Sequence, residues 1–166
     1  MPRSRRSGPL HRLLTTLTRR RPVRAGTRSA PAPAPGPGNH GLVLEYRPRL
    51  DGRPDPGEVV WTWVPYEDDP AQGKDRPVLI IGRLDDDLAG LMLTSKDHDR
   101  DAEQESRRGR HWRDVGTGAW DRERRPSEVR LDRLIPVQAT SVRREGAAVD
   151  QALFENVVAE ARRYLP

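Results

Sequence analysis

The sequence predicts a small, mainly β domain, a closed barrel with one helix at its C-terminal end, preceded by a disordered basic tail. Three observations lead to this prediction. Short runs of β-branched and aromatic residues, separated by turn residues, fill residues 58–137. Apolar residues with helical spacing follow at 150–164, and an arginine-rich segment rich in proline precedes the domain. Several short strands with one packing helix are typical of small barrels.

Residues 1–40 differ in charge from the rest of the chain. They carry nine arginines and no acidic residue, whereas the remaining residues carry 21 basic and 25 acidic groups. Residues 29–40 hold an Ala-Pro repeat, which favours an extended linker. We therefore predict a disordered tail and linker at 1–40, dispensable for folding, and a folded domain at 41–166. The alternative is a short amphipathic helix that lies on an anionic membrane or on RNA phosphates, with one apolar face formed by Leu10, Leu13, Leu14 and Leu17.

Composition excludes several classes of site. The chain has no cysteine, which rules out disulfides, thiolate zinc sites and cysteine nucleophiles. It has no run of about 18 apolar residues, so no transmembrane helix is expected. The Arg5-Arg6 pair is not followed by the apolar segment of an export signal, and we expect a cytoplasmic protein.

Five segments are predicted to be strands: 58–64, 77–83, 88–95, 111–115 and 127–137, the last as one strand or two. The first contains Val59, Trp61 and Trp63 in alternation, and we expect both tryptophans to pack in the barrel core. The segment 77–83 reads as a buried strand, and the aspartates at 85–87 read as a turn. Loops are expected at 65–75 and 97–110.

The clearest helix prediction is 150–164. Asp150 is suited to the N-cap, and two arginines near the other end suit the negative end of the helix dipole. The residues with helical spacing are Leu153, Phe154, Val157, Val158, Ala161 and Leu165. This apolar stripe is predicted to pack against the barrel.

Three motifs, in this order, resemble the PemK/MazF toxins of toxin–antitoxin systems. They are the Gly-Glu-Val-Val-Trp sequence at 57–61, the Arg-Pro-Val-Leu-Ile-Ile sequence at 76–81, and Thr94-Ser95 followed by Val-Arg-Leu-Asp at 129–132. The match runs through about residues 57–165, and the order and spacing of the motifs make it fairly specific. The resemblance implies an SH3-like small barrel of the CcdB/MazF type.

The same resemblance implies an endoribonuclease that cuts single-stranded mRNA without a metal or other cofactor. In such an enzyme the 2′-OH attacks the phosphate and leaves a 2′,3′-cyclic phosphate, so the protein needs a base and groups that stabilise negative charge. The resemblance also implies a homodimer and a cognate antitoxin that neutralises the toxin. The alternative is a barrel of the same type that cuts nothing, either a CcdB-like topoisomerase poison or a degenerate, nuclease-dead RNA-binding protein.

Arg76 is the first site candidate, because the matching arginine of the family contacts the scissile phosphate. Without the resemblance, an ion pair with a nearby carboxylate of residues 67–75 would be the ordinary interpretation. Thr94 and Ser95 have hydroxyls that could bind a phosphate oxygen or position the 2′-OH, or they simply end a strand.

Arg130 and Asp132 are two apart on a predicted strand and therefore face the same side. The resemblance makes the aspartate a base and the arginine a stabiliser of charge, whereas a surface salt bridge is the equally weighted alternative. Trp112 and Trp120 are candidates for stacking on unpaired bases.

The chain departs from the family pattern in one respect. Some PemK-type toxins use a histidine in the loop before the Arg-Pro step, and loop 65–75 has none. His98 and His111 are the available substitutes. A metal site around His98 is less expected than a solvated charged loop, because the spacing of possible ligands does not support one.

Overall fold

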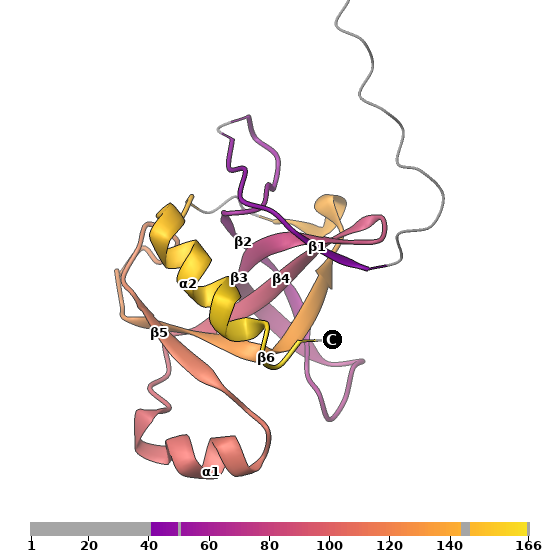
Figure 1. The fold of residues 1–166 in the computed structure, drawn as a ribbon. Coiled ribbons are helices and arrows are strands. Elements are labelled where there is room, and N and C mark those ends of the chain that lie inside the picture. Colours follow the sequence, from indigo (N-terminus) through magenta and orange to yellow (C-terminus); the bar gives the residue numbers. More distant parts are fainter. Residues whose placement is uncertain (1–40, 50, 144–146, 166) are drawn as a thin grey trace, which may run out of the picture. The chain divides into compact units, whose positions relative to one another are not determined.

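The computed structural model describes residues 41–49, 51–143 and 147–165, so the predicted tail and linker at 1–40 lie outside the described residues. The described chain forms six strands, two short 3-10 helices and two α-helices (Figure 1). In chain order these elements are β1 (Leu42–Leu44), β2 (Val59–Pro65), β3 (Gly73–Leu84), β4 (Asp87–Thr94), η1 (Asp99–Asp101), α1 (Ala102–Arg107), β5 (Trp112–Gly116), β6 (Ser127–Val137), η2 (Ala139–Ser141) and α2 (Gln151–Ala161).

The strands form one antiparallel sheet in the order β1-β3-β4-β6-β5, with β2 also paired to β3. The chain that follows β6 closes the sheet onto β2. Arg143 N donates to Trp61 O at 2.9 Å, and Val59 N donates to Ala147 O at 3.0 Å. This architecture confirms the predicted mainly β fold with a C-terminal helix.

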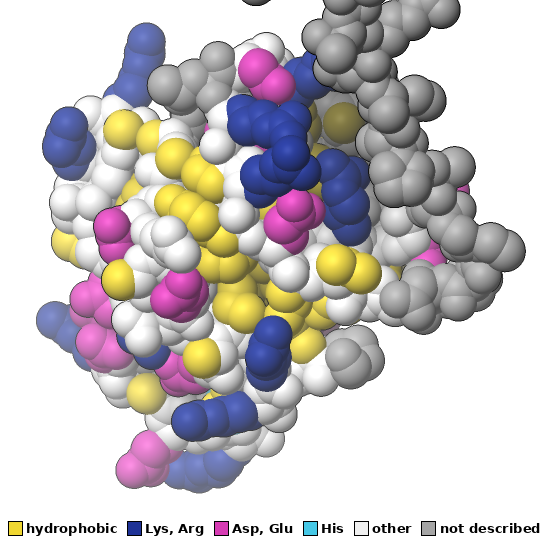
Figure 2. Space-filling model, turned by 45° about the horizontal axis from the view of Figure 1, so that its top comes forward, with side chains coloured by type: hydrophobic (Ala, Val, Ile, Leu, Met, Phe, Trp, Pro, Cys, Tyr) yellow, Lys and Arg dark blue, Asp and Glu magenta, His cyan; other side chains and the backbone are white. Residues whose placement is uncertain are grey.

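Two apolar clusters fill the two faces of the strands. On β3, Leu79 and Ile81 belong to the cluster under α2, and Val78 and Ile80 belong to the cluster on the other face. Because successive side chains of a strand point to opposite faces, burial on both faces explains the continuous Val-Leu-Ile-Ile run. On the face shown in Figure 2, a band of hydrophobic side chains is still visible at the surface between charged ones.

Helix α2 lies across one face of the sheet (Figure 1). The Asp150 carboxylate accepts hydrogen bonds from Ala152 N and Leu153 N and so caps the first turn, as predicted. The side chains on α2 that are buried against the sheet are Phe154, Val157, Val158 and Ala161. The Phe154 ring also lies 5.0 Å from the Tyr46 ring, centroid to centroid.

Gly57 sits where the chain turns into β2. Its φ is +100°, a conformation that favours glycine, and a Cβ there would lie 2.8 Å from the Tyr46 ring. The Tyr46 hydroxyl donates to Val149 O at 2.9 Å. Glycine therefore allows the start of β2, the Tyr46 ring and the entry to α2 to pack together.

The expectation that Trp61 and Trp63 pack in the core was wrong. Both share a strand face with buried Val59, but Trp63 is 46% exposed and Trp61 is only partly buried. The alternation of side chains along β2 places both tryptophans on the same side of the strand as Val59. Only the part of that side around Val59 is buried by other residues. The predicted loop 97–110 also contains η1 and α1, and β3 begins at Gly73 inside the predicted loop 65–75.

Candidate functional site

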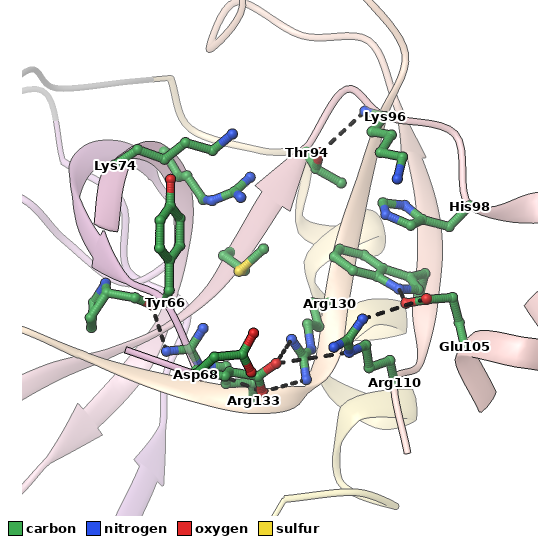
Figure 3. Close-up of a pocket in the computed structure, with 15 residues that line it drawn as sticks. Tyr66, Asp68, Lys74, Thr94, Lys96, His98, Glu105, Arg110, Arg130 and Arg133 are labelled. Atoms are coloured by element: carbon green, nitrogen blue, oxygen red, sulfur yellow. Dashed lines mark hydrogen bonds and ion pairs between the residues drawn. The ribbon is translucent and has the colours of Figure 1, made fainter. Parts of the chain in front are cut away.

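A cavity of about 340 Å³ opens between the loop after β2, the edges of β3 and β4, and the α1–β5 region (Figure 3). Six arginine or lysine side chains and three carboxylates line it, together with Thr94, His98 and Trp112. Four of the residues predicted from the sequence therefore meet here: Arg76, Thr94, Trp112 and Arg130. Asp132 does not line the cavity but is hydrogen-bonded to Arg130.

Arg76 lies near the start of β3 and is partly buried. Among the described residues, no hydrogen bond or ion pair holds its guanidinium. Two of the carboxylates considered as alternative partners bind other arginines: Glu67 binds Arg130, and Asp75 binds Arg143 at 2.9 Å. Burial lowers the pKa of Arg76; Tyr66 acts in the opposite direction, and the charge of Arg133 lowers the pKa further. A desolvated cation without a counter-ion is suited to receive an anion.

Thr94 ends β4 on the same side of the cavity as two lysines (Figure 3). Its Oγ1 accepts a hydrogen bond from Lys96 N at 3.1 Å, which leaves the hydroxyl hydrogen available to a ligand. Within the described chain, the ammonium groups of Lys74 and Lys96 have no hydrogen-bonding or ion-pair partner. Among the described residues, three cations without counter-ions therefore line the same cavity as the Thr94 hydroxyl.

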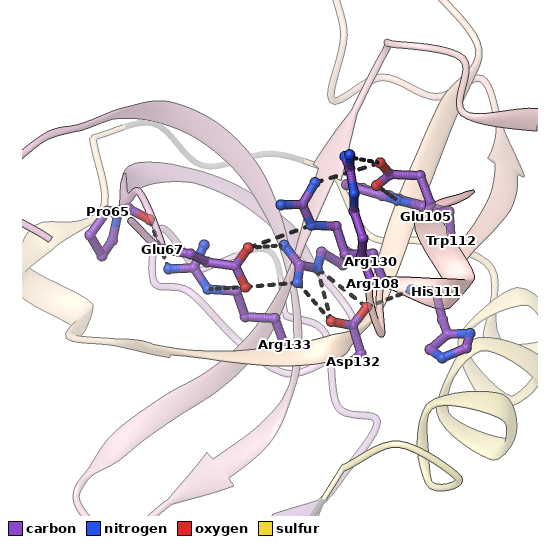
Figure 4. A network of polar contacts seen from close by, with 10 residues as sticks. Pro65, Glu67, Glu105, Arg108, His111, Trp112, Arg130, Asp132 and Arg133 are labelled. Atoms are coloured by element: carbon purple, nitrogen blue, oxygen red, sulfur yellow. Dashed lines mark hydrogen bonds and ion pairs between the residues drawn. The ribbon is translucent and has the colours of Figure 1, made fainter. Parts of the chain in front are cut away.

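In contrast to Arg76 and the two lysines, Arg130 is paired with carboxylates (Figure 4). Its guanidinium donates to both oxygens of Glu67, at 2.8 and 2.7 Å, and to Asp132 Oδ2 at 2.7 Å. Asp132 Oδ1 also accepts from His111 N at 2.7 Å. The Arg130 side chain is 8% exposed and the Asp132 side chain 12% exposed, so the pair belongs to a largely buried network and not to a surface salt bridge, which was the alternative interpretation.

The pKa values of this network reflect these contacts. Burial acts to lower the pKa of Arg130, but its hydrogen bonds to Asp132 and Glu67 outweigh burial and raise it above the ordinary value. The hydrogen bond from Arg130 lowers the pKa of Glu67. Arg130 and Glu67 are therefore firmly charged, and neither is prepared to exchange a proton near neutral pH.

Ser95 and Trp120 lie away from this cavity. Ser95 is exposed and lines two smaller cavities, one of about 180 Å³ that also touches Arg76, Thr94 and Trp120. Trp120 is 5% exposed in the core, and its Nε1 donates to Ser127 Oγ. The buried position leaves little of the Trp120 ring for a base, which removes the basis for assigning it to RNA stacking.

Trp112 does line the cavity, and its ring is packed on His98 with centroids 4.0 Å apart and planes 3° from parallel. Its Nε1 donates to Glu105 Oε2 at 3.3 Å. Glu105 belongs to α1, which the sequence did not predict. This short helix lies inside a charged loop, and its sequence has no apolar residues at helical spacing. The sequence therefore gave no signal for Glu105.

One group of carboxylates, Asp97, Asp99 and Glu128, has oxygens within 4.8 Å of one another. Both Glu128 oxygens accept hydrogen bonds from His98, so we assign no metal site to this group. In the part of the chain that the structure describes, no helix has the length and apolar character needed to cross a membrane.

The fold and the cavity together define a small β-barrel domain with a cavity lined by six arginine or lysine side chains. Comparison with known families then identifies the family. Residues 55–165 match the PemK-like, MazF-like toxins of type II toxin–antitoxin systems, and the chain belongs to this family. A search of curated proteins gives no match.

Proposed function

We propose that this chain is an endoribonuclease toxin that cleaves single-stranded mRNA without a metal. The observation that carries the proposal is that the Arg76 guanidinium, which no described residue pairs, lines the same cavity as the Thr94 hydroxyl, Lys74 and Lys96. Ordinary folded proteins pair a partly buried arginine, because an uncompensated charge costs free energy. A phosphodiester entering the cavity would supply the missing negative charge.

The reaction needs little from the protein. RNA carries its nucleophile, the 2′-OH, next to each phosphate, so attack forms the O2′–P bond and releases the 5′-oxygen. Arg76 would hold the non-bridging oxygens and stabilise the extra negative charge that develops on them. Thr94 would donate its hydroxyl hydrogen to the same phosphate group. The products would be a 2′,3′-cyclic phosphate and a 5′-OH.

In this proposal, Asp132 is not the base and Arg130 is not the stabiliser of charge that the resemblance implied. The Asp132 carboxylate is already bound to Arg130 and to His111 N, and Arg130 is already bound to two carboxylates. We propose that the pair shapes the wall of the cavity and keeps Glu67 away from the phosphate. Ser95 would contact RNA only beyond the scissile phosphate, because it lies outside the main cavity.

The proposal includes the partners implied by the family. They are single-stranded RNA, a cognate antitoxin that neutralises the toxin, and a second copy of the chain in a homodimer, all in the cytoplasm.

A second candidate function is RNA binding without cleavage. Glu67 supports it, because this carboxylate neutralises Arg130 at the cavity, and Asp68 adds a second negative charge to the lining. Carboxylates repel RNA phosphates unless cations offset them. The topoisomerase-binding alternative has no such support in the structure.

The test is to incubate the full chain with a long RNA in excess EDTA and to map the new ends. We expect 2′,3′-cyclic phosphate and 5′-OH ends, unchanged by EDTA. Arg76→Gln should slow cleavage by about 10²-fold, the scale of losing one donor to the transition state. Arg83→Gln, on the same strand but outside the cavity, is the control and should cleave like wild type. Absence of new ends, or ends that require a metal, would overturn the proposal.

A further inference from the structure

His98 is held at the edge of the cavity by contacts that fix its ring. Its Nδ1 lies 2.9 Å from Glu128 Oε2, and its backbone N donates to Glu128 Oε1 at 3.0 Å. The ring is stacked on Trp112. Only 12% of the His98 side chain is exposed, and the same holds for Glu128. Two contacts from one buried carboxylate and one from an indole leave the imidazole a single orientation.

This orientation fixes where the imidazole can accept a proton. A carboxylate only accepts hydrogen bonds, so the hydrogen between the two side chains belongs to His98 Nδ1. The neutral ring therefore has its lone pair on Nε2. No described residue forms a hydrogen bond with Nε2, and Figure 3 shows the ring pointing toward the cavity beside Lys96.

Three other carboxylates in or next to the cavity, Glu67, Glu105 and Asp132, are held by hydrogen bonds and are less suited to take a proton. Glu67 is bound by Arg130, which lowers the pKa of Glu67. Burial acts to raise the pKa of Glu105, but the hydrogen bond from Trp112 and the charge of Arg110 lower it overall. Asp132 does not line the cavity and has both oxygens engaged.

We propose that His98 is the general base of the cavity and that Glu128 is its positioning residue. The inference rests on the proposed nuclease function. His98 Nε2 takes the proton of the 2′-OH as the O2′–P bond forms. The P–O5′ bond breaks, and the 5′-oxygen leaves with its electron pair and takes a proton from water. Glu128 orients the ring and stabilises the imidazolium that results, as the carboxylate does in a Ser-His-Asp triad.

Several charges face His98 and bear on the pH at which it acts. Glu128 of β6 contacts Nδ1, and Glu105 of α1 lies close enough for its charge to interact with the ring. Lys96 lies beside the ring, and Asp97 and Asp99 flank His98 in the chain (Figure 3). Glu128 is the one carboxylate in direct contact, so its removal should have the largest effect on the pH profile.

The decisive variant is His98→Asn in the full chain. The asparagine amide nitrogen can replace Nδ1 as a donor to Glu128, while nothing replaces Nε2. We expect cleavage to slow by about 10²- to 10⁴-fold, the range for loss of a general base. Binding of an RNA with a 2′-deoxy residue at the cleavage site should change by less than about twofold, because the cations are intact. His111→Asn is the control, since its ring is stacked on Tyr164 and does not line the cavity.

A pH profile tests Glu128. Cleavage by wild type should rise with pH as the neutral imidazole forms. Glu128→Gln removes the charge that stabilises the imidazolium, so this rise should move to lower pH, and the maximal rate should fall. If Glu128 contributed only to folding, cleavage by Glu128→Gln would rise at the same pH as cleavage by wild type.

The outcomes separate the two proposals. Equal cleavage by wild type and folded His98→Asn overturns the inference and leaves the proposed function standing. An unchanged pH profile in Glu128→Gln overturns the positioning role. Failure of wild type to cleave any RNA overturns the proposed function, and this inference with it.

Discussion

Replacing Arg130 by alanine should destabilise the protein strongly, although the residue borders a solvent-filled cavity. Arg130 is 6% exposed and its guanidinium donates five hydrogen bonds of 2.7 to 3.3 Å to Glu67 and Asp132. Removing it leaves two carboxylates without their main partner. Breaking a buried ion pair from one side costs about 3–5 kcal/mol.

The structure narrows the range of the free energy of unfolding that Arg130→Ala should lose. The Glu67 side chain is 38% exposed and lies within 4.0 Å of Arg110 and Arg133, so water and these cations can compensate it. Asp132 is 12% exposed and keeps only the hydrogen bond from His111 N. The loss should therefore fall near the lower limit, about 3 kcal/mol. Arg76→Ala should cost less than about 1 kcal/mol, because no ion pair is broken and a desolvated charge is removed.

Urea unfolding at pH 7, followed by tryptophan fluorescence, measures both variants. The two arginines line the same cavity, so each is the control for the other. A loss below about 1 kcal/mol for Arg130→Ala, or equal losses for the two variants, would refute the distinction between a paired and an unpaired arginine.

Three further predictions concern RNA affinity, packing and pH. Glu67→Gln should strengthen RNA binding at low salt, measured by fluorescence anisotropy, because it removes a negative charge and frees donors of Arg130; weaker binding would contradict this role. Phe154→Ala should cost about 3–5 kcal/mol, since the ring is buried against the sheet, and a loss below about 1 kcal/mol would mean that α2 packs elsewhere. The hydrogen bond from Arg125 lowers the pKa of buried Asp121, so this carboxylate contributes stability above its unfolded pKa and loses the contribution as pH falls through its folded pKa. Urea midpoints should therefore fall as the pH drops below about 4, and Asp121→Asn should flatten that decline; an unchanged slope would contradict it.

The sequence by itself determined five of the strands and the main helix of this fold. Alternating and continuous apolar runs located β2 to β6, and the helical stripe with its Asp150 cap located α2. These signals are local, because a strand or helix that buries one face must repeat apolar residues at its own period. The motifs around Arg76, Thr94 and Arg130 likewise indicated the family and brought three residues of the cavity to notice.

Only the tertiary structure decided which faces are covered and which charges are paired. The sequence predicted Trp63 in the core and Trp120 as a residue that stacks on bases, yet the first is exposed and the second buried. Periodicity gives the side of a strand, whereas coverage depends on segments distant in sequence.

The same holds for the site. Arg130 meets Glu67 across 63 positions, and His98 meets Glu128 across 30, while Arg76 has no partner among the described residues despite four carboxylates between residues 67 and 75. Hydrogen bonds and ion pairs act over a few ångströms, so they depend on how the strands and loops come together in space. Residue types and their spacing indicate which residues are candidates for the site. Only the folded chain shows which of the described cations lacks a counter-ion and which imidazole nitrogen faces the cavity.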